Sequence, residues 1–164
     1  PVFRFERWRY RELDEVVVFG PSFDRNFDGS GEEGRVVGLL GTGELDGKMF
    51  LCRDSLRKGF VQEEDGDNTA IHEFVHLIDK MDGRVDGMPK LLMKRQYVLP
   101  WLDLIRHKID EIEAGESDFN PYGANGKEEF LAVAGEYFFE RPEKMKESHP
   151  ELYRAMQLIF EKPD

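Results

Sequence analysis

Residues 72–76 read His-Glu-Phe-Val-His, so two histidines stand four positions apart and a glutamate follows the first of them. In an α-helix, positions i and i+4 lie on the same face, so His72 and His76 can together bind one zinc ion. Glu73 is then placed to act as the general base toward a water molecule activated by the metal. The pentapeptide therefore predicts a metal-dependent hydrolytic site.

The alternative is a structural helix that carries both histidines by accident. The apolar residues around the motif would cover most of a helix surface, and they are Ala70, Ile71, Phe74, Val75, Leu77 and Ile78. The polar residues form one narrow stripe, which comprises Thr69, His72, Glu73, His76 and Asp79. A helix that is apolar almost all round is buried, and burying two histidines with two carboxylates is costly unless a cation binds them. The flanking sequence therefore favours the metal site.

A catalytic zinc ion usually has three protein ligands, so the motif needs a third. A second, largely apolar helix is predicted over Lys127–Glu140, and its Glu129 and Glu136 lie seven positions apart on one face. Three ligands from one helix do not easily surround a tetrahedral ion, so Asp79 is expected to support the site by holding a histidine N–H or a neighbouring cation. The pattern favours Glu129 or Glu136 as the ligand without separating them. The other two histidines are expected away from the metal, at a solvent-facing and a cap or loop position: His107 and His149.

Composition limits the class of protein. The 164 residues suffice for one domain with a hydrophobic core, and the net charge of −11 argues against nucleic acid as a partner. Cys52 is the one cysteine, which excludes an internal disulfide and is typical of a reducing compartment. No apolar run reaches the ~18 residues that a membrane helix needs, and no signal peptide is visible. The sequence begins at Pro1 rather than at methionine, so its start is no guide to a removed leader. We expect a cytoplasmic protein with no membrane partner.

The first half of the chain predicts a small sheet. Three β-branched or apolar runs favour strands, at Glu15–Phe19, Arg35–Leu40 and Lys48–Arg53. Residues 22–34 predict a loop that lacks the ligand spacing of a calcium site, and residues 41–47 predict a hairpin connection.

The second half predicts helices. A short helical turn is expected at Asp54–Lys58, and the motif helix should begin after the cap at residues 66–68 and end near Asp82 and Gly83. Further helices are expected from Pro100 through Ile112, over Lys127–Glu140, and from Pro150 through Phe160, with a polar loop at residues 115–126. This order predicts an α+β fold, in which a small N-terminal antiparallel or mixed sheet packs on a mainly helical C-terminal half.

Several further motifs accompany the pentapeptide. They are Ile71–Asp79 around it, the Asp82-Gly83 and Asp86–Pro89 turn residues, Tyr122–Asn125, Glu129–Phe139, Pro142 and His149–Tyr153. In combination they resemble the Mlc titration factor A family of bacterial zinc peptidases. The resemblance covers residues 15–164 and is strongest over residues 68–160. The chain departs from the family at Gly123-Ala-Asn125, where Ala-Ala-Thr is frequent, and at Val75, where alanine is frequent. Longer family members carry further N-terminal helices and a C-terminal tail.

The resemblance implies a gluzincin-type peptidase whose catalytic core is similar to that of anthrax lethal factor. The sequence shows no repeat, low-complexity tract or linker, so residues 1–164 are expected to form a single domain, and the resemblance implies that it is zincin-like. The resemblance also implies that His72, His76 and Glu129 bind one zinc ion and that Glu73 is the general base. By the same resemblance, Tyr122 corresponds to a family tyrosine, whose phenol can donate to the oxyanion.

Asp79 and Glu136 are expected to support the ligands. We further expect the strand Lys48–Arg53 to run along the cleft and pair with extended substrate.

The resemblance also implies the partners. The family is linked to aminopeptidase-type activity, so a peptide or protein substrate is expected. The family is named for sequestering a transcriptional repressor, so the alternative is a regulator that binds such a repressor and in which zinc is structural or vestigial.

Overall fold

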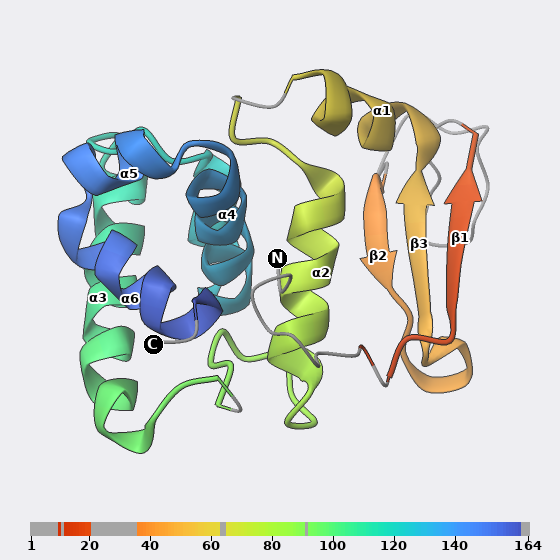
Figure 1. Cartoon of the computed structure of the whole chain (residues 1–164), viewed down its shortest axis with the longest axis horizontal. Helices are drawn as coiled ribbons and strands as arrows, with labels where there is room; N and C mark the ends of the chain where they lie inside the picture. Colours follow the sequence, from red (N-terminus) through yellow and green to blue (C-terminus); the bar gives the residue numbers. More distant parts are fainter. Residues whose placement is uncertain (1–9, 11, 21–35, 63–64, 91, 162–164) are drawn as a thin grey trace.

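A computed structural model describes Tyr10 and residues 12–20, 36–62, 65–90 and 92–161. It has the predicted α+β architecture, with a small sheet on one side and helices on the other (Figure 1). The strands are β1 (Glu15–Phe19), β2 (Gly38–Leu40) and β3 (Lys48–Cys52). The α-helices are α1 (Arg53–Val61), α2 (Thr69–Lys80), α3 (Val98–Glu113), α4 (Lys127–Glu140), α5 (Pro142–Ser148) and α6 (Pro150–Phe160). The predicted loop 22–34 and Arg35 lie outside the described residues.

The sheet is mixed, and β3 is its central strand. β1 pairs with β3 in parallel, with Val17 opposite Phe50, and β2 pairs with β3 antiparallel, with Leu39 opposite Phe50. The expectation that the strand at Lys48–Arg53 pairs with substrate is therefore wrong, because β1 and β2 occupy both of its sides. In the described sheet β2 is the edge strand that faces the helices (Figure 1).

Most predicted elements are confirmed, with some differences. The second strand begins at Gly38 and is shorter than the predicted strand, which reached back to Arg35. β3 ends at Cys52, so α1 begins at Arg53 and is longer than the expected turn. α3 begins at Val98, which places Pro100 within the first turn, where a backbone N–H has no helical partner to lose. An unpredicted helix, α5, follows Pro142, which serves as its first residue.

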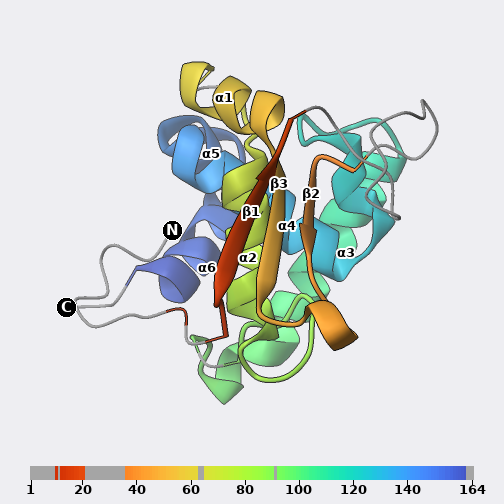
Figure 2. The ribbon, with the colours of Figure 1, turned by 90° about the vertical axis from the view of Figure 1, so that its right-hand side faces the viewer.

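Helix α2 lies between the sheet on one side and helices α3, α4, α5 and α6 on the other (Figures 1 and 2). On the sheet side Leu77 packs with Met49 and Leu51 of β3. On the other side Val75 packs against α4, where a Cβ on Gly135 would lie 2.7 Å from Val75 Cγ2. Only glycine therefore permits this close approach of α2 and α4, and both helices carry candidate ligands.

Candidate metal centre

The N-terminus of α2 is fixed by Asn68. Its Oδ1 caps the helix by accepting from Ile71 N at 3.1 Å, and its Nδ2 donates to Gly59 O and to Glu140 Oε1. The side chain therefore ties the start of the motif helix to α1 and α4, which sets where the histidines point.

His72, His76 and Glu129 converge at the α2–α4 interface. Glu129 Oε2 lies 3.0 Å from His72 Nε2 and 3.3 Å from His76 Nε2, and the two Nε2 atoms are 3.1 Å apart. The side chains are 12–21% exposed. Glu129 lies in the first turn of α4, where the helix dipole favours a carboxylate. No other group of three such residues within the described ranges comes this close together.

The orientation of His72 tests whether this cluster suits a metal. Glu136 lies on the same face of α4 as Glu129, seven positions further on. Its Oε1 lies 2.7 Å from His72 Nδ1, and its Oε2 accepts a hydrogen bond from Asn68 N. When Nδ1–H donates to Glu136, Nε2 carries a lone pair that points at the other two donors. Two imidazole nitrogens and one carboxylate oxygen converging in this way form a donor set that zinc prefers, so the residues fit the metal.

His76 differs from His72 in its second nitrogen. His76 Nδ1 is buried and has no hydrogen-bond partner among the residues that the structure describes. Its ring lies edge-on to the His72 ring, with centroids 4.7 Å apart. The two imidazoles are therefore held in different ways, His72 by a carboxylate and His76 by packing.

The acid–base properties of the cluster follow from its charges. Burial disfavours the charged imidazole of His72, but hydrogen bonds with Glu129 and Glu136 outweigh it and raise its pKa to about 10. Burial also opposes the charged form of Glu129, but hydrogen bonds with His72 and His76 outweigh it and lower the pKa of Glu129 to about 2. Burial raises the pKa of Glu73 to about 6. The surroundings thus stabilise positive charge at the point where the three donors meet.

Glu73 and Tyr122 line the cleft beside the cluster. Glu73 is 6% exposed, and Tyr122 is 50% exposed with its ring 5.8 Å from that of His72. Two adjoining pockets, of about 380 and 600 Å³, open on either side and share the motif residues His72 and Glu73, together with Val36, Gly38 and Tyr122. The larger pocket is also lined by His76 and Glu129, so a peptide lying in it would contact the cluster.

Among the described residues no strand pairs with the outer edge of β2, and this edge forms one wall of the cleft. Val37 O accepts from Cys52 N and Gly41 N donates to Lys48 O, so these two residues face β3. Because hydrogen bonding alternates along an antiparallel pair, Gly38 and Leu40 direct their N–H and C=O groups to the open edge. An extended peptide can pair there.

Gly38 is a candidate functional residue that sequence reasoning missed. A Cβ at this position would lie 2.5 Å from Glu73 Oε1 and 2.7 Å from Thr69 Cγ2. Glycine inside a strand often marks such a close approach, and this was the available signal.

Asp79 has a different role from the expected one. The sequence predicts that it holds a histidine N–H or a cation, but its two oxygens accept backbone N–H groups of Asp86, Gly87 and Met88 at 2.7–2.8 Å. The Asp79 side chain is fully buried. Burial raises its pKa to about 6, although the backbone hydrogen bonds act in the opposite direction and lower it. Gly87 has φ +73°, and a Cβ there would lie 2.6 Å from the Lys127 backbone. Asp79 therefore fixes a turn that packs against the start of α4, two residues before Glu129.

We expect Asp79→Asn to weaken zinc binding about 10-fold or more, measured by competition with a chromogenic chelator. The amide puts an NH₂ group against backbone donors, so the turn shifts and carries the start of α4 with it. Asp118→Asn is the matched control, because Asp118 also joins helices, through Tyr137, Lys144 and His149. The control should lower the melting temperature without changing zinc affinity, and an equal loss of affinity in both variants would contradict the role of Asp79.

The remaining histidines lie away from the cluster. His107 is exposed on α3, and His149 precedes α6 with its Nε2 2.7 Å from Asp118 Oδ1. Hydrogen bonds from Lys144, His149 and Tyr137 outweigh burial and hold the pKa of Asp118 well below its usual range. This second network joins helices and lies outside the cleft.

A mixed sheet whose described edge strand lies beside a partly buried cluster of two histidines and a carboxylate is the arrangement of a metallopeptidase. The chain matches the glucose-regulated metallo-peptidase M90 family over residues 1–161, and it belongs to that family. The family implies a metal, for which zinc suits the donor set. No helix within the described residues is both long and apolar enough to cross a membrane.

The chain is also similar in sequence to individual curated proteins. An uncharacterised protein from Synechocystis is 27% identical over 161 residues, which cover 92% of this chain and 58% of the relative. Mlc titration factor A of Pectobacterium atrosepticum is 28% identical over 138 residues, 76% of this chain and 51% of the relative. The protein of the same name from Yersinia enterocolitica is 32% identical over 97 residues, 54% of this chain and 36% of the relative. The chain thus spans only a third to somewhat over half of the length of these relatives.

Proposed function

We propose that this chain is a zinc-dependent peptidase, formed as one zincin-like, gluzincin-type domain over residues 1–164, in which His72, His76 and Glu129 hold the metal. The observation that carries the proposal is the convergence of three donor atoms within 4.8 Å beside Glu73. Zinc bound there would polarise the scissile carbonyl and lower the pKa of a water molecule. Glu136 orients His72, and a purely structural site would have no need of Glu73.

The chain's own groups supply the remaining steps. Glu73 takes a proton from the attacking water on a carboxylate oxygen and passes it to the leaving amine nitrogen. Gly38 and Leu40 hold the substrate backbone along the edge of β2, so the scissile bond lies over the cluster. The buried position of Glu73 keeps bulk water from its carboxylate.

Tyr122 is proposed to donate its phenol to the developing oxyanion, since it lies at the mouth of both pockets beside His72. Tyr122→Phe should lower kcat about 10- to 100-fold and leave KM nearly unchanged, because the hydrogen bond forms only in the transition state. Steady-state kinetics on one peptide substrate measure both constants. If kcat is unchanged, Tyr122 only lines the cleft.

The finer specificity proposed is aminopeptidase-type. Glu128 lines the larger pocket next to Glu129, and a second carboxylate there suits a free N-terminal ammonium. Peptides with a free N-terminus should be cleaved faster than their acetylated counterparts, and equal rates would indicate an endopeptidase.

Metal content and hydrolysis test the proposal together. Elemental analysis of the purified chain should give about one zinc per chain. A mixed peptide library, followed by mass spectrometry, should be cleaved before chelation, stay intact after it, and be cleaved again once zinc is restored. Zinc at full stoichiometry with an intact library would overturn the peptidase proposal.

Binding of a partner protein is the second candidate, and the name Mlc titration factor A of the relatives favours it. In this reading the chain acts by holding a transcriptional repressor, with zinc structural or vestigial. Retained repressor binding by a hydrolytically inactive chain would favour it. We propose a cytoplasmic location for either activity, because the single cysteine is typical of a reducing compartment.

A further inference from the structure

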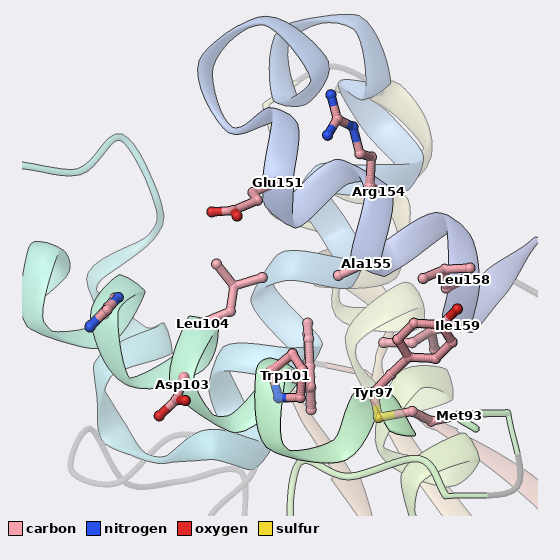
Figure 3. A pocket seen from close by; sticks show the side chains of 12 residues that line it. Met93, Tyr97, Trp101, Asp103, Leu104, Glu151, Arg154, Ala155, Leu158 and Ile159 are labelled. Atoms are coloured by element: carbon pink, nitrogen blue, oxygen red, sulfur yellow. The ribbon is translucent and has the colours of Figure 1, made fainter. Parts of the chain in front are cut away.

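A groove of about 410 Å³ lies between α3 and α6 and shares no residue with the catalytic cleft (Figure 3). α2 packs on one side of α4, whereas α3 and α6 lie on the other (Figure 1). The groove therefore belongs to the helical side of the molecule, away from the sheet and the metal cluster.

The floor and walls of the groove are apolar. Trp101 and Ile159 form buried parts of it, at 3% and 2% exposure, and Leu158 forms a wall that is 43% exposed. The Trp101 indole N–H donates to Gly87 O at 2.8 Å, so it is already used within the chain. A small polar ligand needs convergent donors or acceptors, and this floor supplies apolar contact instead.

The shape of the groove suits a helix. Met93 and Tyr97 lie near Leu158 and Ile159 at one end, and Glu151 lies on the α6 side of the other end (Figure 3). From Tyr97 to His107 the lining follows α3 for about 15 Å, or close to three helical turns. A helix of about twelve residues could lie there with apolar side chains at i, i+3, i+4 and i+7.

The charges at the rim of the groove indicate which charge a bound helix should carry. The carboxylates of Asp103 and Glu151 point to the same side of the groove, whereas the guanidinium of Arg154 extends away from them (Figure 3). Asp103 has an exposed partner, Arg106, at 3.5 Å, which screens it only in part. The chain as a whole carries a net charge of −11. Lysine or arginine in a bound helix would therefore be attracted to this end.

We propose that the α3–α6 groove is a docking site for an amphipathic helix of a partner protein, with basic residues placed over Asp103 and Glu151. The site does not depend on the proposed peptidase activity, because it shares no residue with the cleft.

Fluorescence polarisation on the full chain tests this docking site. The probe is a labelled peptide of about twelve residues, with leucines at the four helical positions and lysines clustered at one end. We expect saturable binding that a chelator leaves unchanged, and weaker binding of a matched peptide with glutamates in place of the lysines. The double variant Asp103→Lys/Glu151→Lys should reverse this preference, each affinity changing about tenfold.

Two further variants separate the groove from general electrostatics. Glu143→Lys/Glu147→Lys makes the same charge change at exposed positions on α5, outside the groove, and should retain the original preference. Leu158→Glu removes the apolar wall and should weaken binding of the lysine peptide. The proposal is overturned if both charge variants shift the affinities equally, if Leu158→Glu binds like the parent chain, or if the peptide does not bind at all.

Discussion

Glu73→Gln should retain zinc and lose peptide hydrolysis by about 10²- to 10⁴-fold. The amide has the same shape as the carboxylate, so it keeps the close approach to Gly38. It lies outside the donor set of His72, His76 and Glu129, so metal content should not change. The amide cannot accept the proton of the attacking water, and this is the step that fails.

Elemental analysis and initial rates on one peptide substrate are the two measurements for this variant. Glu113→Gln, an exposed substitution on α3 with the same charge change, is the matched control and should hydrolyse at the parent rate. Parent-like activity in Glu73→Gln would exclude Glu73 as the base. Loss of zinc together with activity would show that the residue acts through the metal site.

Gly38→Ala should lower kcat/KM about 100-fold without loss of zinc. A Cβ cannot remain 2.5 Å from Glu73 Oε1, so either the edge strand moves outward or the Glu73 carboxylate rotates. The first change misplaces the substrate and the second misplaces the base. The proposed metal ligands come from α2 and α4 rather than from β2, so they should keep their positions.

Gly20→Ala is the matched control for this prediction. Gly20 also adjoins a strand, and the nearest atom to an added Cβ would be Arg53 Nη2 at 3.9 Å, so the methyl group has room. Both variants should unfold near the parent temperature, and only Gly38→Ala should lose activity. Full activity in Gly38→Ala would mean that β2 does not set the position of Glu73.

Local sequence patterns predicted most of the α-helices, though not α5, and they predicted that His72 and His76 meet a glutamate of α4. α2 and α4 follow from their apolar periodicity, and the spacing of His72 and His76 places both on one face. The residues alone left Glu129 and Glu136 equal, because both lie on the same face of α4. In the structure the two glutamates contact different atoms: Glu129 lies against the Nε2 atoms of both histidines, whereas Glu136 lies against His72 Nδ1.

The features that local patterns did not predict depend on contacts between distant segments. The order of the strands is decided by pairing across the sheet, so nothing within Lys48–Cys52 indicates that β3 is central. The partners of Asp79 are backbone N–H groups of a turn, which every sequence offers. The constraint on Gly38 comes from side chains of α2, and a glycine in a short strand indicates only that something lies close.

The shortness of the edge strand has a consequence for which proteins can be cut. β2 spans only Gly38–Leu40 and offers open backbone groups at its two ends, about 7 Å apart. A substrate must give up its own hydrogen bonds over that distance before it can pair there. Segments already inside a helix or a folded sheet cannot do so, whereas chain ends and unfolded stretches can. Under the proposed mechanism, the strand would spare folded proteins and admit flexible ones, whatever side chains they carry.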